Sequence, residues 1–348
     1  MGKKKKKNKS LVTYPEYVMI SVLSDLKLPR RSFNGIIKEI FNFCGRPGVN
    51  WPDWCFMPVE IWLNYLRDAI EDVGPEFSLS ELLGLKNTNE EYLRIEVAHY
   101  LAAFAAWNYT KGIYRFEEDL LKAITAGAFP KTLPVNVFLR LPEWCVYIDL
   151  SHVNKDLAGF FVFIDDIEDF EHPVLSLVFA PKQNHWPSRY EITLEQTSID
   201  KQILDSGNVP KYRERLSSSI GAELTEEQTV AYLKQDYETL LKVVLYLCID
   251  QPDIKLKKYP ETSPSRPSIT TKNGEPEYFV TAKPRIWQVG KTQSDSMRAA
   301  RKAANRKSGY KVKPHWRSAH YHGVWRGTGE DRYFHLNWWP PTPIGTKS

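Results

Sequence analysis

Two histidines near the C-terminus have the type and spacing that could support chemistry. His320 and His322 lie two residues apart in a segment with β-strand composition, so both side chains would point to one face of that strand. There they could share a metal ion or act as an acid–base pair. The only carboxylates nearby are Glu330 and Asp331, which fall in an expected turn, and two histidines alone make a weak metal site. We therefore expect no metal, no cofactor and no catalytic residue.

The same segment interleaves aromatic and cationic side chains. Besides the two histidines, this C-terminal motif contains His315, Trp316, Arg317, Gly323, Trp325, Arg326 and Trp338. Aromatic rings stack on unpaired bases and arginines contact phosphates, so the pattern favours contact with nucleic acid or the ribosome. The alternative is that histidines and tryptophans pack a hairpin onto the rest of the protein, which would bury Trp325 and Trp338.

A row of cations precedes this motif. On a helix predicted over residues 294–307, four cations fall within one arc of about 140°. They are Arg298, Arg301, Lys302 and Arg306, and small residues occupy the opposite side. Long cations backed by small residues could lie along a phosphate backbone and release its counterions. The alternative is a solvated helix face without a polyanionic partner.

Charge is strongly segregated along the 348-residue chain, although its formal net charge is only +5. Residues 1–10 contain six lysines and no acid, and residues 255–348 contain 19 Lys and Arg against 6 Asp and Glu. The intervening residues 11–254 contain 22 basic and 36 acidic residues. An acidic body between two basic ends indicates that the ends meet a polyanion while the body has another task.

Several protein classes are excluded by the sequence. The four cysteines are widely spaced without a C-x-x-C pair, which argues against a zinc ribbon or a disulfide framework, and Cys145 is expected to be a buried thiol. Gly290-Lys291-Thr292 could end a phosphate-binding loop, but Arg285 stands where that loop needs its first glycine. No apolar run approaches the roughly 18–20 residues of a membrane helix. We expect a soluble cytoplasmic protein with no membrane partner.

The elements that must position these residues follow from hydrophobic periodicity. Apolar spacing predicts helices over residues 58–73, 90–108 and 114–124. From residue 144 the period changes to two, which predicts an antiparallel sheet with strands at 145–149, 159–164, 174–180 and 190–195. A long helix over 226–249 should cover one face of the sheet. The predicted fold class is α+β, with a helical N-terminal half and a central antiparallel four-stranded sheet.

The expected organisation has five segments. They are a disordered lysine-rich tail (1–10), a helical region (11–85), an α+β body (86–254), a linker or strap (255–284) and a basic C-terminal region (285–348). Pro, Ser, Thr and Lys dominate the linker. The last segment should contain a strand over 285–290, the cationic helix and a hairpin turning at 327–331.

Five motifs carry a resemblance to a known family. They are GIYRFEEDLLKAI (112–124), LPEWCVYIDLS (141–151), LYLCIDQPDI (245–254), IWQVG (286–290) and PHWRSAHYHGVWRGTG (314–329) with the closing NWWPP. In this order they resemble the type V-A anti-CRISPR family that lowers the level of the CRISPR effector nuclease. The similarity runs from about residue 90 to the C-terminus. Its more specific parts are the body motif, with Trp144, Cys145 and Asp149, and the His320-x-His322-Gly323 motif.

The resemblance implies a phage or plasmid protein that is not an enzyme and acts in the bacterial cytoplasm. It implies recognition of the effector's N-terminal peptide as that peptide leaves the ribosome, followed by loss of the translated mRNA. The expected partners are that peptide and the ribosome or mRNA. An acidic body could bind a basic or apolar peptide, and basic ends could hold RNA. An RNA-binding regulator or a His-dependent nuclease of a phage or plasmid is the alternative function.

Overall fold

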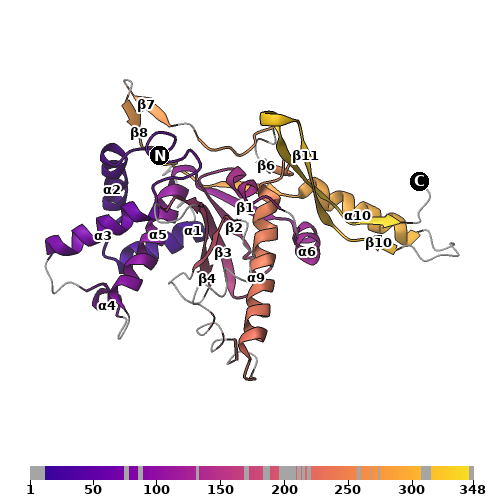
Figure 1. The fold of residues 1–348 in the computed structure, drawn as a ribbon, viewed down its shortest axis with the longest axis horizontal. Coiled ribbons are helices and arrows are strands. Elements are labelled where there is room, and N and C mark those ends of the chain that lie inside the picture. The colour runs from indigo at the N-terminus through magenta and orange to yellow at the C-terminus, as the bar shows by residue number, and fades with distance from the viewer. Residues whose placement is uncertain are drawn as a thin grey trace, which may run out of the picture.

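In a computed structural model the protein has three layers, a sheet with helices on both of its faces (Figure 1). The described residues are 12–73, 78–84, 89–130, 133–167, 172–182, 189–195, 209, 213, 216–217, 221–256, 259, 261–267, 269–272, 275–306 and 315–344. The predicted lysine-rich tail, residues 1–10, lies outside them.

Helices from the N-terminal part form the first layer. They are α1 (Tyr14–Asp25), α2 (Arg30–Phe43), α3 (Val59–Val73), α4 (Leu79–Leu82) and α5 (Glu90–Thr110). Local signals set their ends. A capping box joins Thr13 and Glu16 at the start of α1. The side chain of Asn89 accepts a hydrogen bond from the Tyr92 backbone N–H at 3.1 Å at the start of α5. The helices predicted over 58–73 and 90–108 are confirmed as α3 and α5.

The middle layer is a seven-stranded mixed sheet in the order β5-β4-β3-β2-β1-β9-β6. Its strands are β1 (Gly112–Phe116), β2 (Cys145–Asp149), β3 (Leu157–Asp165), β4 (Val174–Pro181), β5 (Arg189–Thr193), β6 (Ile254–Leu256) and β9 (Arg285–Val289). The four predicted strands are present as the antiparallel run β2 to β5. The predicted four-stranded sheet was nevertheless too small. Strand β1 pairs in parallel with both β2 and β9, and β6 pairs antiparallel with β9.

The helix predicted over residues 114–124 was wrong in its first part. Those residues contain the end of β1 followed by α6 (Glu118–Ala126). Phe116, Leu120 and Ile124 are spaced four apart and all enter one buried cluster, so a helical period describes them although Phe116 belongs to a strand. Parallel partners of β1 come from distant parts of the chain, and no local pattern reveals them.

Side chains alternate between the two faces of the sheet. On β3, Phe161 belongs to the cluster beneath the N-terminal helices, whereas Phe160 and Val162 belong to the cluster on the opposite face. Helix α5 crosses the first face, where Phe104 and Trp107 meet Phe161 edge-on with ring centroids 5.5 and 5.7 Å away. The N-terminal helices therefore cover the first face of the sheet over strands β1 to β4.

Two helices cover part of the second face. They are α6 and the long helix α9 (Glu226–Leu247), which confirms the helix predicted over 226–249, and the short 3₁₀ helix η1 (Val135–Arg140) lies beside them. The buried Lys242 of α9 donates hydrogen bonds to the carbonyls of Thr125 and Gly127 at 2.7 and 2.9 Å. These bonds join the middle of α9 to the C-terminal end of α6. Within the described ranges, no helix is long and apolar enough to cross a membrane.

The region predicted as a linker contains the hairpin β7 (Thr270–Lys272) and β8 (Glu275–Glu277). After it, β9 enters the central sheet and Gly290, at a φ of 82°, turns the chain into α10 (Lys291–Arg306). The carboxylate of Asp253 accepts hydrogen bonds from the Thr292 and Gln293 backbone N–H groups at 2.6 and 3.0 Å. Asp253 thus caps α10 and anchors it beside β6.

The described part of the chain ends in two consecutive antiparallel strand pairs, which together are here called the C-terminal ribbon. It consists of β10 (His315–Arg317), β11 (His320–Arg326), β12 (Tyr333–Trp339) and β13 (Thr342–Ile344), with the 3₁₀ turn η2 (Gly329–Asp331) at one tip. Strand β11 pairs with β12 and β10 pairs with β13, which confirms the predicted hairpin. Figure 1 shows the ribbon and α10 extending together from the body.

Candidate functional site

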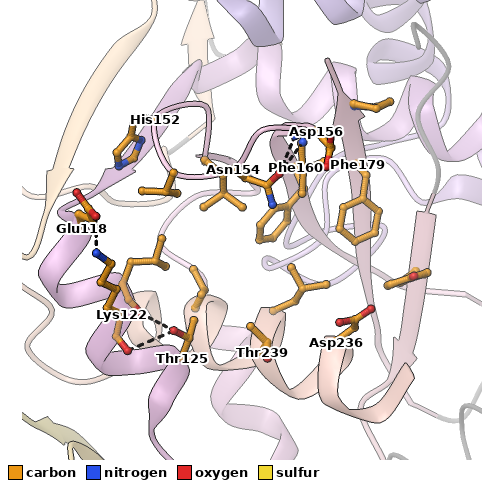
Figure 2. A pocket seen from close by; sticks show the side chains of 18 residues that line it. Glu118, Lys122, Thr125, His152, Asn154, Asp156, Phe160, Phe179, Asp236 and Thr239 are labelled. Atoms are coloured by element: carbon orange, nitrogen blue, oxygen red, sulfur yellow. Dashed lines mark hydrogen bonds and ion pairs between the residues drawn. The ribbon is translucent and has the colours of Figure 1, made fainter. Parts of the chain in front are cut away.

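An open groove of about 760 Å³ lies on the second face of the sheet, between α6, α9 and the β2–β3 loop. We call it the α6–α9 groove; Figure 2 shows its lining side chains. Apolar side chains from strands and helices form its floor, namely Leu121, Leu150, Leu157, Phe160, Phe179, Leu240 and Val243. Phe160 and Val243 are almost fully buried. The size falls within the usual range of ligand pockets, about 300–1,000 Å³.

The rim of the groove is mainly acidic. Glu118, Asp156 and Asp236 stand around it with a single lysine, Lys122. The Lys122 ammonium lies 2.5 Å from Glu118, and this hydrogen bond lowers the pKa of the Glu118 carboxyl. Asp156 and Asp236 are exposed on opposite walls. The groove therefore combines an apolar floor with a net negative edge.

The β2–β3 loop is held in place by its own hydrogen bonds. Lys182 donates to the carbonyls of Ser151 and Asn154 at 2.9 and 2.7 Å. The Asn154 side chain accepts from the backbone N–H groups of Asp156 and Leu157, both at 2.9 Å. Figure 2 shows this loop closing the side of the groove opposite α9. These bonds fix the wall of the groove that the loop forms.

The cationic row on α10 faces α6. Arg298 pairs with Asp119 at 2.6 Å, Glu117 at 3.1 Å and Asp295 at 3.0 Å, and Arg301 pairs with Asp119 at 2.6 Å. These hydrogen bonds hold the pKa of Asp119 below its usual value. Two of the four predicted phosphate-contacting cations therefore join α10 to α6.

The other two members of the row differ. Lys302 is exposed on α10, and the side chain of Arg306 lies outside what the structure describes. Their predicted contact with nucleic acid or the ribosome stays a prediction, as it does for Arg298 and Arg301.

Docking of the C-terminal ribbon depends on Trp338. This side chain is 6% exposed and meets Tyr246 of α9 edge-on, with ring centroids 5.6 Å apart. Tyr321 Oη donates to the carbonyl of Lys242 at 2.5 Å. The expectation of a buried Trp325 was wrong, because that ring is 49% exposed near the ribbon's tip. The ribbon is attached at its middle, and its tip projects beyond α9.

The histidine pair packs against a single tryptophan. The ring of Trp339 is stacked on His322 at 4.8 Å and meets His320 edge-on at 5.5 Å. Gly323 lies against the Phe334 ring, which leaves no space for a Cβ at this position. The side chain of His315 is outside the described part. Across the residues that the structure describes, no three His, Cys, Asp or Glu side chains gather in a metal-binding group.

A third histidine links the ribbon to the body. His335 Nδ1 is paired with Asp250, whose second oxygen accepts a hydrogen bond from Arg140 at 2.8 Å. The Leu336 backbone N–H donates to the same carboxylate at 3.1 Å, and the Asp250 N–H donates to the Leu336 carbonyl at 3.0 Å. Asp250 therefore anchors β12 to the body.

Comparison with known proteins places this architecture in a family. The model of the AcrVA2-like family, described as anti-CRISPR type V subtype A2, matches residues 114–346. The chain belongs to this family. The family resemblance seen in the sequence is confirmed.

Two individual proteins are also similar to this member of the family. A crystal structure of AcrVA2 shares the fold, with a TM-score of 0.63 and 22% identity, covering 95% of this chain and 99% of that one. Protein FinQ of Escherichia coli is 21% identical over 284 residues, which is 71% of this chain and 76% of that protein. The family match begins in β1 and includes α6, α9 and the ribbon. Both walls of the groove therefore lie inside it.

In this AcrVA2-like protein the body motif is structural. Trp144 is buried and donates to the Asp53 carbonyl at 2.8 Å. Burial raises the pKa of the Cys145 thiol well above its usual value, as expected for an inert buried cysteine. Burial opposes ionisation of Asp149, but hydrogen bonds from Ser151 and Arg115 outweigh it and lower the pKa of that carboxyl. These three side chains fix β2 between its neighbours and do not line the groove, whereas Leu150 at the end of the same motif does.

No residue of the groove was assigned to a site from the sequence, although Leu121 and Lys122 lie in the motif at 112–124 and Leu150 lies in the motif at 141–151. Its lining comes from α6, α9, β3, β4, β5 and the β2–β3 loop, so no contiguous motif marks it. The only available signal was the excess of acids in residues 11–254. That signal pointed to the body without locating a site.

Proposed function

We propose that the protein is an anti-CRISPR inhibitor of a type V-A effector and binds the effector's N-terminal nascent peptide in the α6–α9 groove. Binding leads to translation-dependent loss of the effector's mRNA. Family membership supports the anti-CRISPR role. The observation that supports peptide binding is the groove with its apolar floor and acidic rim.

The chemistry of the groove favours a short segment with apolar side chains beside basic ones. Fully burying one Leu, Ile or Phe side chain contributes roughly 1.5–3 kcal/mol, so two or three such side chains could anchor a peptide on the floor. Lysine or arginine in the same segment would meet Asp156 and Asp236 at the rim. Charge at the rim adds specificity and speeds encounter more than it adds affinity.

In this proposal the protein acts by binding rather than by catalysis. It works in the bacterial cytoplasm, where the nascent chain and its message are joined by the ribosome, and it uses no cofactor. Destruction of the message is left to enzymes of the host.

A reporter with recoded codons tests the proposal. The effector's N-terminal segment is fused to a fluorescent protein, and both mRNA and fluorescence are measured with and without the inhibitor. Silencing should survive synonymous recoding, because the peptide is recognised, and should vanish when a frameshift changes the peptide but keeps most nucleotides. Silencing that follows the nucleotide sequence instead would favour the RNA-binding regulator or nuclease.

Charge reversal at the rim tests the location. The double variant Asp156→Lys and Asp236→Lys should weaken binding of a synthetic N-terminal peptide and abolish reporter silencing. The matched control reverses Asp25 and Glu39, two exposed acids on α1 and α2 across the sheet. Equal peptide affinity in both variants would remove the groove from the proposal.

A further inference from the structure

The C-terminal ribbon carries two arginines that form no ion pair with the described part of the chain. Arg317 and Arg326 are exposed, and within the described part of the chain no carboxylate pairs with either, whereas Arg298 alone meets three carboxylates on α6 and α10. An exposed guanidinium without a partner remains available to an anion from outside. The two cation sets in the basic C-terminal region thus have different roles.

Aromatic rings accompany these free arginines on the ribbon. Three of them are half exposed: Trp325 at 49%, Tyr333 at 50% and Trp339 at 44%. The strand register places Arg326 opposite Tyr333 and His320 opposite Trp339, so these four side chains lie on one face of the hairpin.

The other face of the hairpin is occupied by the body. Phe334, Leu336 and Trp338 alternate with the exposed residues of β12 and are all buried. This face packs on α9 through Trp338. On the opposite face Arg326, Tyr333 and Trp339 are exposed towards the two ends of the hairpin, and His335 between them pairs with Asp250. At the ribbon's tip, Arg332 lies over the Trp325 ring at 4.7 Å, which keeps that ring oriented.

We propose that this outer face, comprising His320, His322, Arg326, Tyr333 and Trp339, with Arg317 at its end, binds single-stranded nucleic acid. Trp339 and Tyr333 stack on unpaired bases while Arg317 and Arg326 hold the phosphates. Stacking needs only the π-face that every base has, so the site is tolerant of sequence. A duplex hides its bases, so it cannot use the aromatic rings. The inference goes beyond the proposed function, because it holds whatever peptide the groove takes.

A nucleic acid fits this face better than a protein does. Arg326 stands opposite the half-exposed Tyr333 ring, a pairing of cation and aromatic ring found in single-strand binding surfaces, and the ribbon's two acids, Glu330 and Asp331, are confined to the η2 turn. Trp325 stands opposite Phe334 on the packed face, so the half-exposed rings of the outer face are Tyr333 and Trp339, at opposite ends of the hairpin. They do not form one apolar patch, whereas the core of a protein interface is continuous and desolvated.

Fluorescence anisotropy with labelled 20-nucleotide probes tests the proposal on the full-length protein. Poly-U RNA, poly-dT DNA and a double-stranded RNA of equal length are titrated at several salt concentrations. Both single strands should bind, and the duplex should bind at least tenfold more weakly. Tighter binding of RNA than DNA would add recognition of the 2′-hydroxyl to the site. Equal or tighter binding of the duplex would overturn the proposal.

Three variants locate the site. Arg317→Ala with Arg326→Ala should make the salt dependence shallower by about 1.4 units, since each lost phosphate contact on a single strand removes about 0.7. Trp339→Ala should weaken binding roughly tenfold, the usual effect of one lost stacking ring, with little change in salt dependence. The control Arg31→Ala with Lys38→Ala removes the same charge from α2, at the far end of the molecule in Figure 1.

The control also decides against alternatives. If the α2 variant reduces the salt dependence as much as the ribbon variant does, binding is a general effect of net charge and the proposal fails. If Arg298→Ala with Arg301→Ala weakens binding more than the ribbon variants do, the surface is α10 and the proposal fails. These measurements use no CRISPR effector, so the reporter assay can fail while this result stands.

Discussion

Helix α10 and the C-terminal ribbon have similar sequence signatures but different surroundings. Both carry spaced arginines within the basic C-terminal region. On α10, Arg298 and Arg301 both form ion pairs with Asp119. On the ribbon, Arg326 faces solvent beside exposed rings. A row of cations in a sequence therefore predicts a binding surface only if no acidic element of the fold packs against it, and that depends on tertiary structure.

The largest expected effect separates the docked and the projecting parts of the ribbon. Trp338→Ala should lower the free energy of unfolding by about 3–5 kcal/mol, because it empties a buried contact with Tyr246. Trp325→Ala should cost about 1 kcal/mol or less, since that ring is half exposed and interacts mainly with Arg332 and Phe334. Urea unfolding followed by circular dichroism measures both. Equal losses would contradict the division of the ribbon.

A buried carboxyl beside a third arginine, Arg285, predicts that the stability of the fold depends on pH. Glu143 is fully buried, accepts a hydrogen bond from Thr110 at 2.7 Å and lies 3.3 Å from Arg285. Burial raises its pKa to about 7, although Arg285 and Thr110 oppose the shift. The folded state then holds a proton that the unfolded chain releases near pH 4.5. The stabilisation that the protonated Glu143 carboxyl contributes is complete below that pH. It is lost as the pH rises through 7, by about 3 kcal/mol at most.

Two variants check the sign of this pH effect in urea unfolding between about pH 2 and pH 8. Glu143→Gln should remove the loss of stability with rising pH, because the amide stays neutral. Asp149→Asn should change the opposite limb, since the lowered pKa of Asp149 gives stability that disappears as the pH falls. A Glu143→Gln variant with the pH profile of the unaltered protein would mean that the carboxyl is ionised throughout.

Removing the ion pairs between α10 and α6 should have a smaller, local effect. Arg298→Ala with Arg301→Ala should increase amide hydrogen exchange in α10 while leaving exchange in β2 to β4 unchanged, because the pairs lie at the surface and join only α10 to α6. The same measurement on Arg317→Ala with Arg326→Ala should show no change in α10. Identical exchange patterns would mean that the two cation sets do not differ.

The smallest effect concerns the histidine pair. His322→Asn should change the free energy of unfolding by no more than about 0.5 kcal/mol and leave reporter silencing intact, because His322 is a partly exposed stacking partner of Trp339. His335→Asn should cost more, since it breaks the link to Asp250. Loss of silencing with His322→Asn at unchanged stability would restore the acid–base interpretation.

Local signals predicted well and long-range ones did not. Alternation marked β2 to β5, and apolar spacing marked α3, α5 and α9, because each signal lies within one element. Strand β1 was missed since its five residues run into α6 without a break in periodicity, and the place of β9 in the sheet depends on a partner far away in the chain. The groove has six sources along the sequence. The ion pairs of Arg298 could not be inferred, because Glu117 and Asp119 precede it by about half of the chain's length.

The position of β9 has a consequence for how the protein is made. This strand lies between β1 and β6, yet it begins at Arg285, long after β1 ends at Phe116. A ribosome adding about 5–20 residues each second must therefore extend the chain for many seconds before the sheet can close. Until then β1 has an open edge, and pairings between such distant segments form slowly. We expect the inhibitor to be a late-maturing protein whose own incomplete chains need protection from aggregation while they are being translated.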